Sequence, residues 1–263
     1  MAFFSKWRTH KAVGEQGQVD VSESDGVRYL HLGSSDTVQS AMRVNAPNEL
    51  ELAYTRAMMG FLLFHPEPRE ILMVGLGGGS VAKYVYHRLP AVRTRVVEIN
   101  PQVVAVARSH FHVPQPDQRF QVEIGDGAAY VGGNAAIADV LMVDGFDSNS
   151  QAEDLASQRF YDDCAAALTD SGVLVANLWS SDRHFDIYLK RIQTSFNDLA
   201  LCMPTGRRSN VIVLGFKRSP GNPRWQDLRE RAKSLEAEFG LEFPEFVNAL
   251  RALNPHSEKR LLI

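Results

Sequence analysis

The sequence is poor in the residues that build disulfide frameworks and metal centres. Its 263 residues include only two cysteines, Cys164 and Cys202, which lie in separate apolar segments without a C-x-x-C pattern. We expect both to be buried free thiols in a cytoplasmic protein, because disulfides are rare in that compartment. The eight histidines are scattered and form no H-E-x-x-H motif, so we expect no metal site.

The sequence also lacks an excess of one charge and a long apolar run. It contains 28 Lys and Arg residues against 31 Asp and Glu residues, a net charge of −3. Such a balance gives no basic surface for nucleic acid or for an anionic membrane. No uncharged apolar run approaches the ~20 residues that span a bilayer. The apolar burst at the start is too short for a signal-peptide core. We therefore expect neither a nucleic-acid partner nor a membrane partner.

What is present predicts one good-sized domain with smaller appendages, since 44% of the residues are hydrophobic. Residues 18–45 alternate polar and apolar side chains between turn sequences, which predicts small β-hairpins. Residues 48–64 follow with helical spacing of apolar side chains, behind an asparagine that can cap a helix. We expect three parts: an N-terminal β-hairpin region (1–47), a central domain (48–218) and a C-terminal helical extension (219–263), which reads as one or two amphipathic helices.

The central domain alternates short apolar segments with segments of helical spacing. The expected strands are 71–74, 93–99, 120–124, 138–144 and 171–179, and the expected helices are 79–88, 101–111, 157–169 and 184–199. A last pair, 200–204 and 210–216, has the pattern of a hairpin. Strands followed by helices at this spacing predict an α/β fold with a Rossmann-like, doubly wound and mostly parallel sheet.

Glycines follow the first of these strands, in the sequence GLGGGS. In an open parallel sheet, glycines at this point permit a tight turn and let a ligand approach the backbone. Ser80 stands where the dinucleotide pattern G-x-G-x-x-G has its last glycine, and such a loop alone is a weak signal. We expect Gly75, Gly77 and Gly79 to contribute to a nucleoside site.

Acidic residues end the next two strands. Glu98 stands 21 residues after Gly77 and can accept hydrogen bonds from both ribose hydroxyls. Asn100 is better placed to cap the following helix, which weakens a purely structural role for Glu98. Asp126 can receive the amino group of adenine, with Gly127 leaving the ring edge clear, although an Asp-Gly turn is an equally good interpretation. The three features in order favour an adenosyl ligand, of the adenosylmethionine type rather than NAD.

Two further acids, Asp144 and Asp147, follow the fourth strand in the sequence VDGFD. An acid that ends a strand can be structural. Two acids in a short loop at the mouth of the same crevice can instead hold a cationic substrate or act as a general base.

These stretches resemble the spermidine synthase family of polyamine aminopropyltransferases, from about residue 27 to residue 216. The glycine loop, Glu98 and the Asp126–Gly127 pair are similar to the family motifs that hold the donor nucleoside. VDGFD is similar to the family's V-D-S-S-D, and QAEDLASQRFY to its P-A-E-S-L-F…F-Y. YLHLGSSDTVQS resembles the hairpin that supplies a nucleoside-contacting glutamine, here Gln39, and the helix after it supplies Tyr54.

The resemblance implies an adenosylmethionine-type transferase fold and transfer of an aminopropyl group from decarboxylated S-adenosylmethionine to a diamine such as putrescine. The donor would be a co-substrate, with no tightly bound cofactor. In this scheme Asp144 is the catalytic base, and Asp147 and Tyr54 bind the acceptor amine. The resemblance also implies small-molecule partners only and assembly as a homodimer.

Several family positions differ in this chain. Gly78 stands in place of an Asp that pairs with the donor amine, and the other departures are Thr55, Arg56, Ser148 and the pair Arg207–Arg208. They leave two alternatives open: an S-adenosylmethionine-dependent methyltransferase, and a catalytically weak protein that binds adenosyl nucleosides. Two acids at 144 and 147 argue against a mere binder. The sequence does not specify the acceptor amine.

Overall fold

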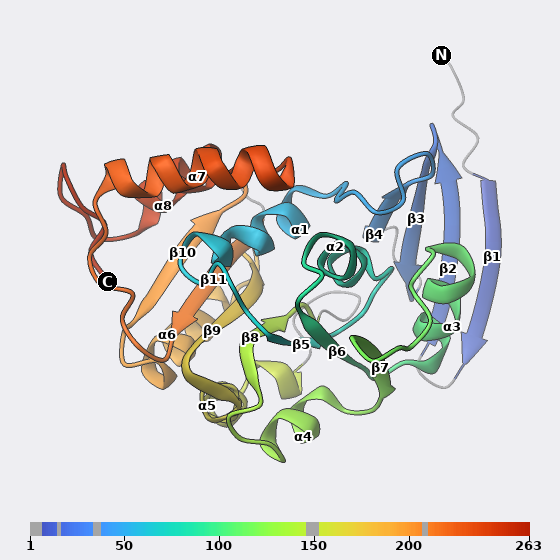
Figure 1. The fold of residues 1–263 in the computed structure, drawn as a ribbon. Helices are drawn as coiled ribbons and strands as arrows, with labels where there is room; N and C mark the ends of the chain where they lie inside the picture. Colours follow the sequence, from blue (N-terminus) through green and yellow to red (C-terminus); the bar gives the residue numbers. More distant parts are fainter. Residues whose placement is uncertain (1–6, 15–16, 34–37, 146–152, 207–209) are drawn as a thin grey trace.

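The computed structural model describes residues 7–14, 17–33, 38–145, 153–206 and 210–263. Two sheets dominate the architecture (Figure 1): a four-stranded antiparallel sheet near the N-terminus and a seven-stranded sheet in the centre. The strands are β1 (Trp7–Gly14), β2 (Gly17–Ser24), β3 (Val27–Leu32), β4 (Val38–Arg43), β5 (Glu70–Val74), β6 (Arg93–Glu98), β7 (Phe120–Ile124), β8 (Ala138–Val143), β9 (Leu168–Trp179), β10 (Ala200–Pro204) and β11 (Asn210–Phe216). The helices are α1 (Ala53–Met58), η1 (Met59–Leu63), α2 (Ser80–Arg88), α3 (Pro101–His110), α4 (Gly127–Gly132), η2 (Glu153–Ala156), α5 (Gln158–Ala167), α6 (Phe185–Ser195), α7 (Trp225–Phe239) and α8 (Phe243–Leu253).

The N-terminal sheet has the order β1-β2-β3-β4 with antiparallel pairing throughout. Its last three strands confirm the hairpins expected over residues 18–45. Strand β1 was not predicted, because its sequence WRTHKAVG has no regular alternation of apolar side chains. Antiparallel pairing with β2 stabilises this strand, since strand formation depends strongly on cross-strand neighbours.

The central sheet has the order β10-β11-β9-β8-β5-β6-β7. Neighbours from β9 to β7 pair in parallel, and the β10–β11 hairpin joins antiparallel at β9. The chain runs from β5 outward to β7 and then returns to β8 on the other side of β5. This reversal creates a switch point at the carboxyl ends of β5 and β8, where α/β proteins bind ligands.

Both faces of the central sheet are covered, which confirms the doubly wound α/β fold. Along β5, Ile71 and Met73 face one core, which includes side chains from α2, α3, α7 and α8. Leu72 and Val74 face a second core, which includes side chains from α4, α5 and α6. The near-continuous apolar sequence of this strand follows from burial on both sides.

The helix expected over residues 48–64 is shorter in the structure. It begins at Ala53, where Leu52 occupies the N-cap position without a side-chain cap, and it tightens into the 3-10 helix η1 from Met59. Asn48 therefore does not cap it. The residues before Ala53 form turns, with the Glu49 amide bonded to the Ala46 carbonyl at 3.1 Å. Helix α4 was not predicted either, since its six residues are too few for a clear period.

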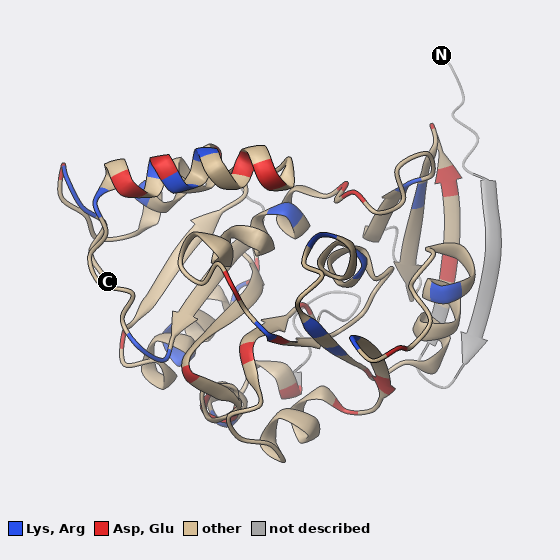
Figure 2. Cartoon of the chain, viewed as in Figure 1, with Lys and Arg blue, Asp and Glu red and all other residues tan. Residues whose placement is uncertain are grey.

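The C-terminal extension forms two amphipathic helices. Residues of α7 at helical spacing are buried (Trp225, Leu228, Ala232, Leu235 and Phe239). The charged residues of α7 alternate along its outer side (Figure 2). Helix α8 packs on β10, and α7 packs on η1. Among the helices that the structure describes, none is long and apolar enough to cross a membrane.

Candidate functional site

A cavity of about 700 Å³ lies at the switch point of the central sheet. Its lining comes from the carboxyl ends of the parallel strands, from the loops that follow them, from β4 and from α1. Strand pairing explains why the residues meet. The residues that directly follow four register-matched positions of β5, β6, β8 and β9 stand in one row across the sheet: Gly75, Glu98, Asp144 and Asn177.

Glu98 is held in place by the backbone of the loops around it. Its carboxylate accepts hydrogen bonds from the Leu76 amide to Oε2 (2.8 Å) and from the Asn100 amide to Oε1 (2.9 Å). The side chain is 7% exposed. Burial raises the pKa of Glu98, and the backbone hydrogen bonds oppose the rise. Asn100 caps α3 by accepting from the Gln102 amide at 2.9 Å, as predicted, so Glu98 is not the helix cap.

The glycines of the loop after β5 are required by backbone packing as well as by the approach of a ligand. Gly75 has a φ of +94°, and a Cβ on it would lie 2.5 Å from the Asp144 carbonyl oxygen. This close approach brings the loop after β5 against the loop after β8. Gly79, with a φ of +68°, is the N-cap of α2 and is packed against Val113. It does not line the cavity, so the structure gives it a packing position rather than the ligand contact that we expected.

Asp126 and Gly127 begin helix α4 and line the cavity. One oxygen of Asp126 accepts from the amides of Ala128 (2.8 Å) and Ala129 (3.2 Å), so this carboxylate caps the helix. A Cβ on Gly127 would collide with the side chain of Val74. The glycine therefore lets α4 approach β5, which differs from the expected role of clearing space for a ring. The second oxygen of Asp126 is not used by the cap.

Asp144 is oriented by a chain of side-chain amides. Asn177 donates from Nδ2 to Oδ1 of Asp144 at 2.8 Å, and Asn210 donates from Nδ2 to Oδ1 of Asn177 at 2.9 Å. Burial raises the pKa of Asp144, while the hydrogen bonds from Asn177 and Tyr54 oppose the rise. A carboxylate with a raised pKa takes up a proton more readily than an exposed one.

Tyr54 reaches the same point from helix α1. Its hydroxyl donates a hydrogen bond to the carbonyl oxygen of Gln39 at 3.2 Å and lies near the carboxylate of Asp144. Burial and the neighbouring carboxylate raise the pKa of Tyr54 well above its ordinary value. The tyrosine is therefore a stable hydrogen-bond donor at neutral pH, and it links β4 to the end of β8.

Trp179 ends strand β9, is 36% exposed and lines the cavity. The indole therefore forms part of the cavity wall. Asn177 lies two residues earlier on the same strand, so both side chains face the same side of the sheet.

The structure brings eight of the ten predicted site residues to this one cavity: Gln39, Tyr54, Gly75, Gly77, Glu98, Asp126, Gly127 and Asp144. Gly79 lies outside its lining. Asp147 falls outside the described residues, as do Arg207 and Arg208. The sequence did not single out Asn177 and Asn210. The sequence signal for Asn177 was its position inside an apolar strand, because a polar side chain is costly to bury without a hydrogen-bond partner.

The charged side chains that line the cavity within the described ranges all carry carboxylates: Glu98, Asp126, Asp144 and Asp154. No Lys, Arg or His of the described part of the chain joins them in the lining. The same residues contain no group of three His, Cys, Asp or Glu side chains that could hold a metal. Such a lining attracts a cationic ligand and disfavours an anionic one.

Known proteins are similar to this chain in sequence and in fold. The family model for the spermine/spermidine synthase domain matches residues 51–208. The polyamine aminopropyltransferase of Chromobacterium violaceum is 42% identical over 97% of this chain and 98% of its own length.

Solved structures show the same fold. A spermidine synthase in complex with the transition state analogue AdoDATO matches with a TM-score of 0.75 at 21% identity, over 95% of this chain and 87% of that one. Human methyltransferase-like protein 13, in complex with SAH, matches with a TM-score of 0.65 at 27% identity, over 72% of this chain and 93% of that one. The full-length likeness to the Chromobacterium protein and the family-model match agree with the site geometry, and the chain belongs to the spermine/spermidine synthase family.

Proposed function

We propose that this protein transfers the aminopropyl group of decarboxylated S-adenosylmethionine to a diamine such as putrescine. Aminopropyl transfer is the activity named for its relatives, and the lining of the cavity supports it. The observation that carries the proposal is the set of four carboxylates, unaccompanied by a cation among the described lining residues. Donor and acceptor are both cations at neutral pH, because a sulfonium and alkylamines with a pKa near ~10 carry positive charge.

The two halves of the cavity accommodate the two substrates. Glu98 and Asp126 lie on the β5-β6-β7 side of Asp144, and we assign the nucleoside to this half. Trp179 lies on the other side of Asp144, because β9 follows β8 in the sheet. Strands are ~4.8 Å apart, so β9 is about 14 Å from β6 and out of reach of a ribose held by Glu98. The acceptor amine therefore lies between Asp144 and Trp179.

Asp144 is the proposed general base. Asp144 takes a proton from the acceptor ammonium, which frees the electron pair of that nitrogen. The neutral nitrogen attacks the carbon next to sulfur, the C–N bond forms, and the C–S bond breaks with its electron pair passing to sulfur, so that methylthioadenosine leaves as a neutral thioether. Asn177 and Tyr54 keep the carboxylate oriented, and much of the rate comes from holding the two cations in line.

A methyltransferase that uses intact S-adenosylmethionine is the alternative on this fold. The human methyltransferase-like structure favours it as a fold, but the lining does not. The intact donor carries an α-carboxylate into a cavity whose described charged residues are all acids. Removing that carboxylate removes the repulsion, so the decarboxylated donor fits better. No resident cofactor is needed for either reaction.

The decisive experiment combines binding and turnover. Thermal shifts with S-adenosylmethionine, its decarboxylated form and methylthioadenosine are compared, followed by an assay of methylthioadenosine release with putrescine. We expect a larger shift with the decarboxylated donor and release that requires the diamine. A larger shift with the intact donor supports methyl transfer, and binding without any turnover supports a nucleoside-binding protein. Assembly as a homodimer and a cytoplasmic location remain predictions from sequence.

A further inference from the structure

We propose that Arg56 is a positioning residue that couples the C-terminal helical extension to the acceptor side of the cavity. The kinetic part of this inference rests on the proposed function. Arg56 lies two residues after Tyr54 on helix α1. The contacts of its guanidinium join α1 to the residues directly before this helix and to Glu242, which is distant in sequence.

Helix α1 has few features that would stabilise it in isolation. It has six residues, its N-cap Leu52 makes no side-chain hydrogen bond, and its first turn has no acidic residue. Helices this short are marginal in water even for favourable sequences. The direction of α1, and with it the position of Tyr54, must therefore be set by contacts from outside the helix.

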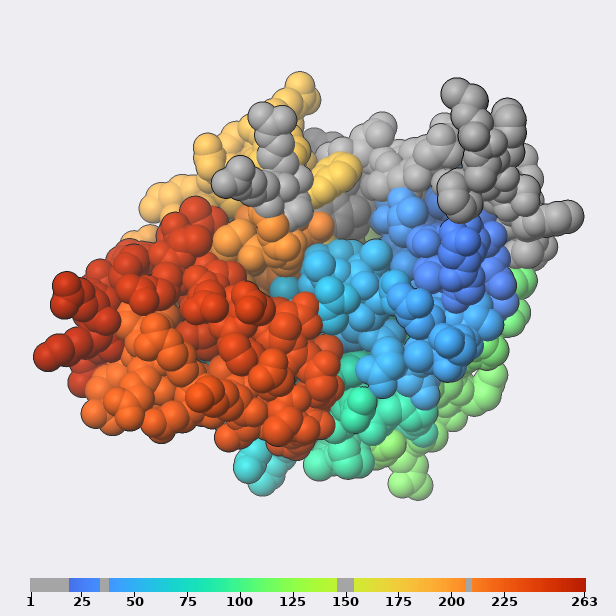
Figure 3. Space-filling view, turned by 90° about the horizontal axis from the view of Figure 1, so that it is seen from above, coloured from blue at the N-terminus to red at the C-terminus, as the bar shows by residue number. Residues whose placement is uncertain are grey.

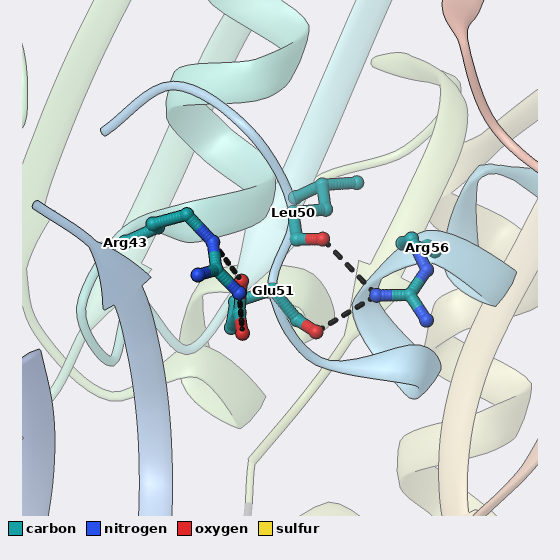
Figure 4. Close-up of polar contacts among 4 residues, drawn as sticks. All are labelled: Arg43, Leu50, Glu51 and Arg56. Carbon is teal, nitrogen blue, oxygen red and sulfur yellow. Dashed lines mark hydrogen bonds and ion pairs between the residues drawn. The ribbon is translucent and has the colours of Figure 1, made fainter. Parts of the chain in front are cut away.

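Arg56 supplies one of these contacts by reaching back to the segment before the helix (Figure 4). Its Nη1 donates to the carbonyl oxygen of Glu51 at 2.7 Å and to that of Leu50 at 3.2 Å. The Glu51 side chain is in turn held by Arg43 of β4, through Nε at 3.1 Å and Nη2 at 2.6 Å. Glu51 is thus held by two guanidinium groups, and Leu52, the next residue, lines the cavity.

The same guanidinium also contacts the C-terminal extension. Its Nε donates to Oε1 of Glu242 at 2.7 Å, and Glu242 stands directly before α8. The extension lies beside the segment that includes α1 and η1 (Figure 3), in agreement with the packing of α7 on η1. Arg56 is therefore the polar link from α8 to the backbone that precedes Tyr54.

The consequence is local. Losing the Arg56 side chain leaves Glu51 held by Arg43 alone and removes the link to Glu242, so α1 can shift and move the Tyr54 hydroxyl away from Asp144. Glu98 belongs to a different strand and keeps its own backbone contacts. We therefore expect kcat/KM for the acceptor to fall while the affinity for the nucleoside stays unchanged.

The test uses the full chain with Arg56→Met, Glu242→Gln and the double variant. For Arg56→Met we expect kcat/KM for the diamine to fall about tenfold, because small misplacements of positioning groups are costly. Methylthioadenosine affinity should stay within about twofold of wild type, since no nucleoside contact changes. Glu242→Gln keeps every backbone contact of Arg56, so it should fold and show a smaller loss, about twofold. The double variant should be no worse than Arg56→Met, because both changes break one linkage.

Arg93→Met is the matched control. It removes the ion pair with Glu70 at the amino ends of β5 and β6, on the far side of the sheet from the strand ends that line the cavity, and we expect wild-type kinetics from it. The inference is overturned if Arg56→Met and this control behave alike, or if nucleoside affinity falls together with acceptor use.

A second readout does not depend on activity. Hydrogen exchange of the backbone amides in residues 50–58 should be faster in Arg56→Met and in Glu242→Gln than in wild type. Unchanged exchange in both variants overturns the inference. If the wild-type protein transfers no aminopropyl group, the proposed function fails, and the exchange measurement still decides whether Arg56 and Glu242 hold α1.

Discussion

Asn177 donates a hydrogen bond from Nδ2 to Oδ1 of Asp144 over 2.8 Å, and thereby fixes the carboxylate at the centre of the cavity. Asn177 is 2% exposed, and its own oxygen is occupied by Asn210. A buried amide whose donor and acceptor are both satisfied holds one rotamer. Orientation of the Asp144 carboxylate, the proposed base, is therefore built into strands β9 and β11.

Replacing Asp144 tests its proposed role as the base most directly. Asp144→Asn keeps the size of the side chain but cannot take up a proton, so we expect kcat to fall by roughly 10²–10⁴-fold. Methylthioadenosine affinity, measured by titration calorimetry, should change little, because the nucleoside half is untouched. An unchanged rate of methylthioadenosine release would remove Asp144 from the mechanism.

The Asn177 hydrogen bond should be visible in the pH dependence of kcat/KM. This bond lowers the pKa of Asp144, against the rise caused by burial. Its loss in Asn177→Ala raises that pKa, so the carboxylate stays protonated to higher pH and the acid limb moves to higher pH. Asn177→Asp should move it further, because a like charge adds to the shift. Coincident profiles for wild type and both variants would show that Asp144 is not the titrating base.

Trp179 provides a test of the acceptor half. An ammonium over an indole face gains about 1–2 kcal/mol when partly desolvated. Trp179→Ala should therefore raise the KM for the diamine about tenfold, with the KM for the donor unchanged, while Trp179→Phe should retain part of the effect. Steady-state kinetics with each substrate varied in turn separates the two constants. An equal rise in both KM values would place the indole against the nucleoside instead.

Much of the site was predictable from sequence, for a geometric reason. Carboxyl ends of parallel strands share one edge of the sheet, so residues that end successive strands, such as Glu98 and Asp144, necessarily gather there. The amide chain was not predictable, because an apolar period marks Asn177 only as an exception and does not name its partner. The cap made by Asp126 and the packing of Gly127 on Val74 depend on where α4 lies, which only the tertiary structure gives.

At Gly78 the departure from the family motif coincides with close packing, which leaves little room for a larger side chain. The Gly78 amide donates to Ser40 Oγ at 2.9 Å, and a Cβ on Gly78 would lie 2.8 Å from Ser40 Cβ and 3.0 Å from a ring carbon of Phe111. Gly78→Ala and Gly78→Asp should each lower the free energy of unfolding by about 1–3 kcal/mol. Ser40→Gly should recover part of the loss in either background, as measured by urea unfolding. Equal losses with and without Ser40→Gly would show that Ser40 is not the obstacle.

Lys83 gives a prediction for stability rather than activity. The side chain is 1% exposed, and its ammonium donates to the carbonyl oxygens of Phe111 (2.6 Å) and Pro47 (2.7 Å) and lies 3.2 Å from the sulfur of Met42. No carboxylate is among these partners. Burial lowers the pKa of Lys83 from 10.5 to about 8.

The sign of the pH effect follows from that lowered pKa of Lys83. Between pH 8 and pH 10.5 the unfolded chain keeps the proton that the folded chain has released, so the lysine's contribution to stability rises with pH in this window. We expect the free energy of unfolding of wild type minus that of Lys83→Met to increase by about 2 kcal/mol from pH 8 to pH 9.5. Urea unfolding at both pH values measures the difference, and the two buried thiols titrate alike in both proteins and cancel. A difference that stays constant would mean that the three acceptors keep Lys83 charged in the folded state throughout this range, with carbonyl dipoles offsetting the cost of its burial.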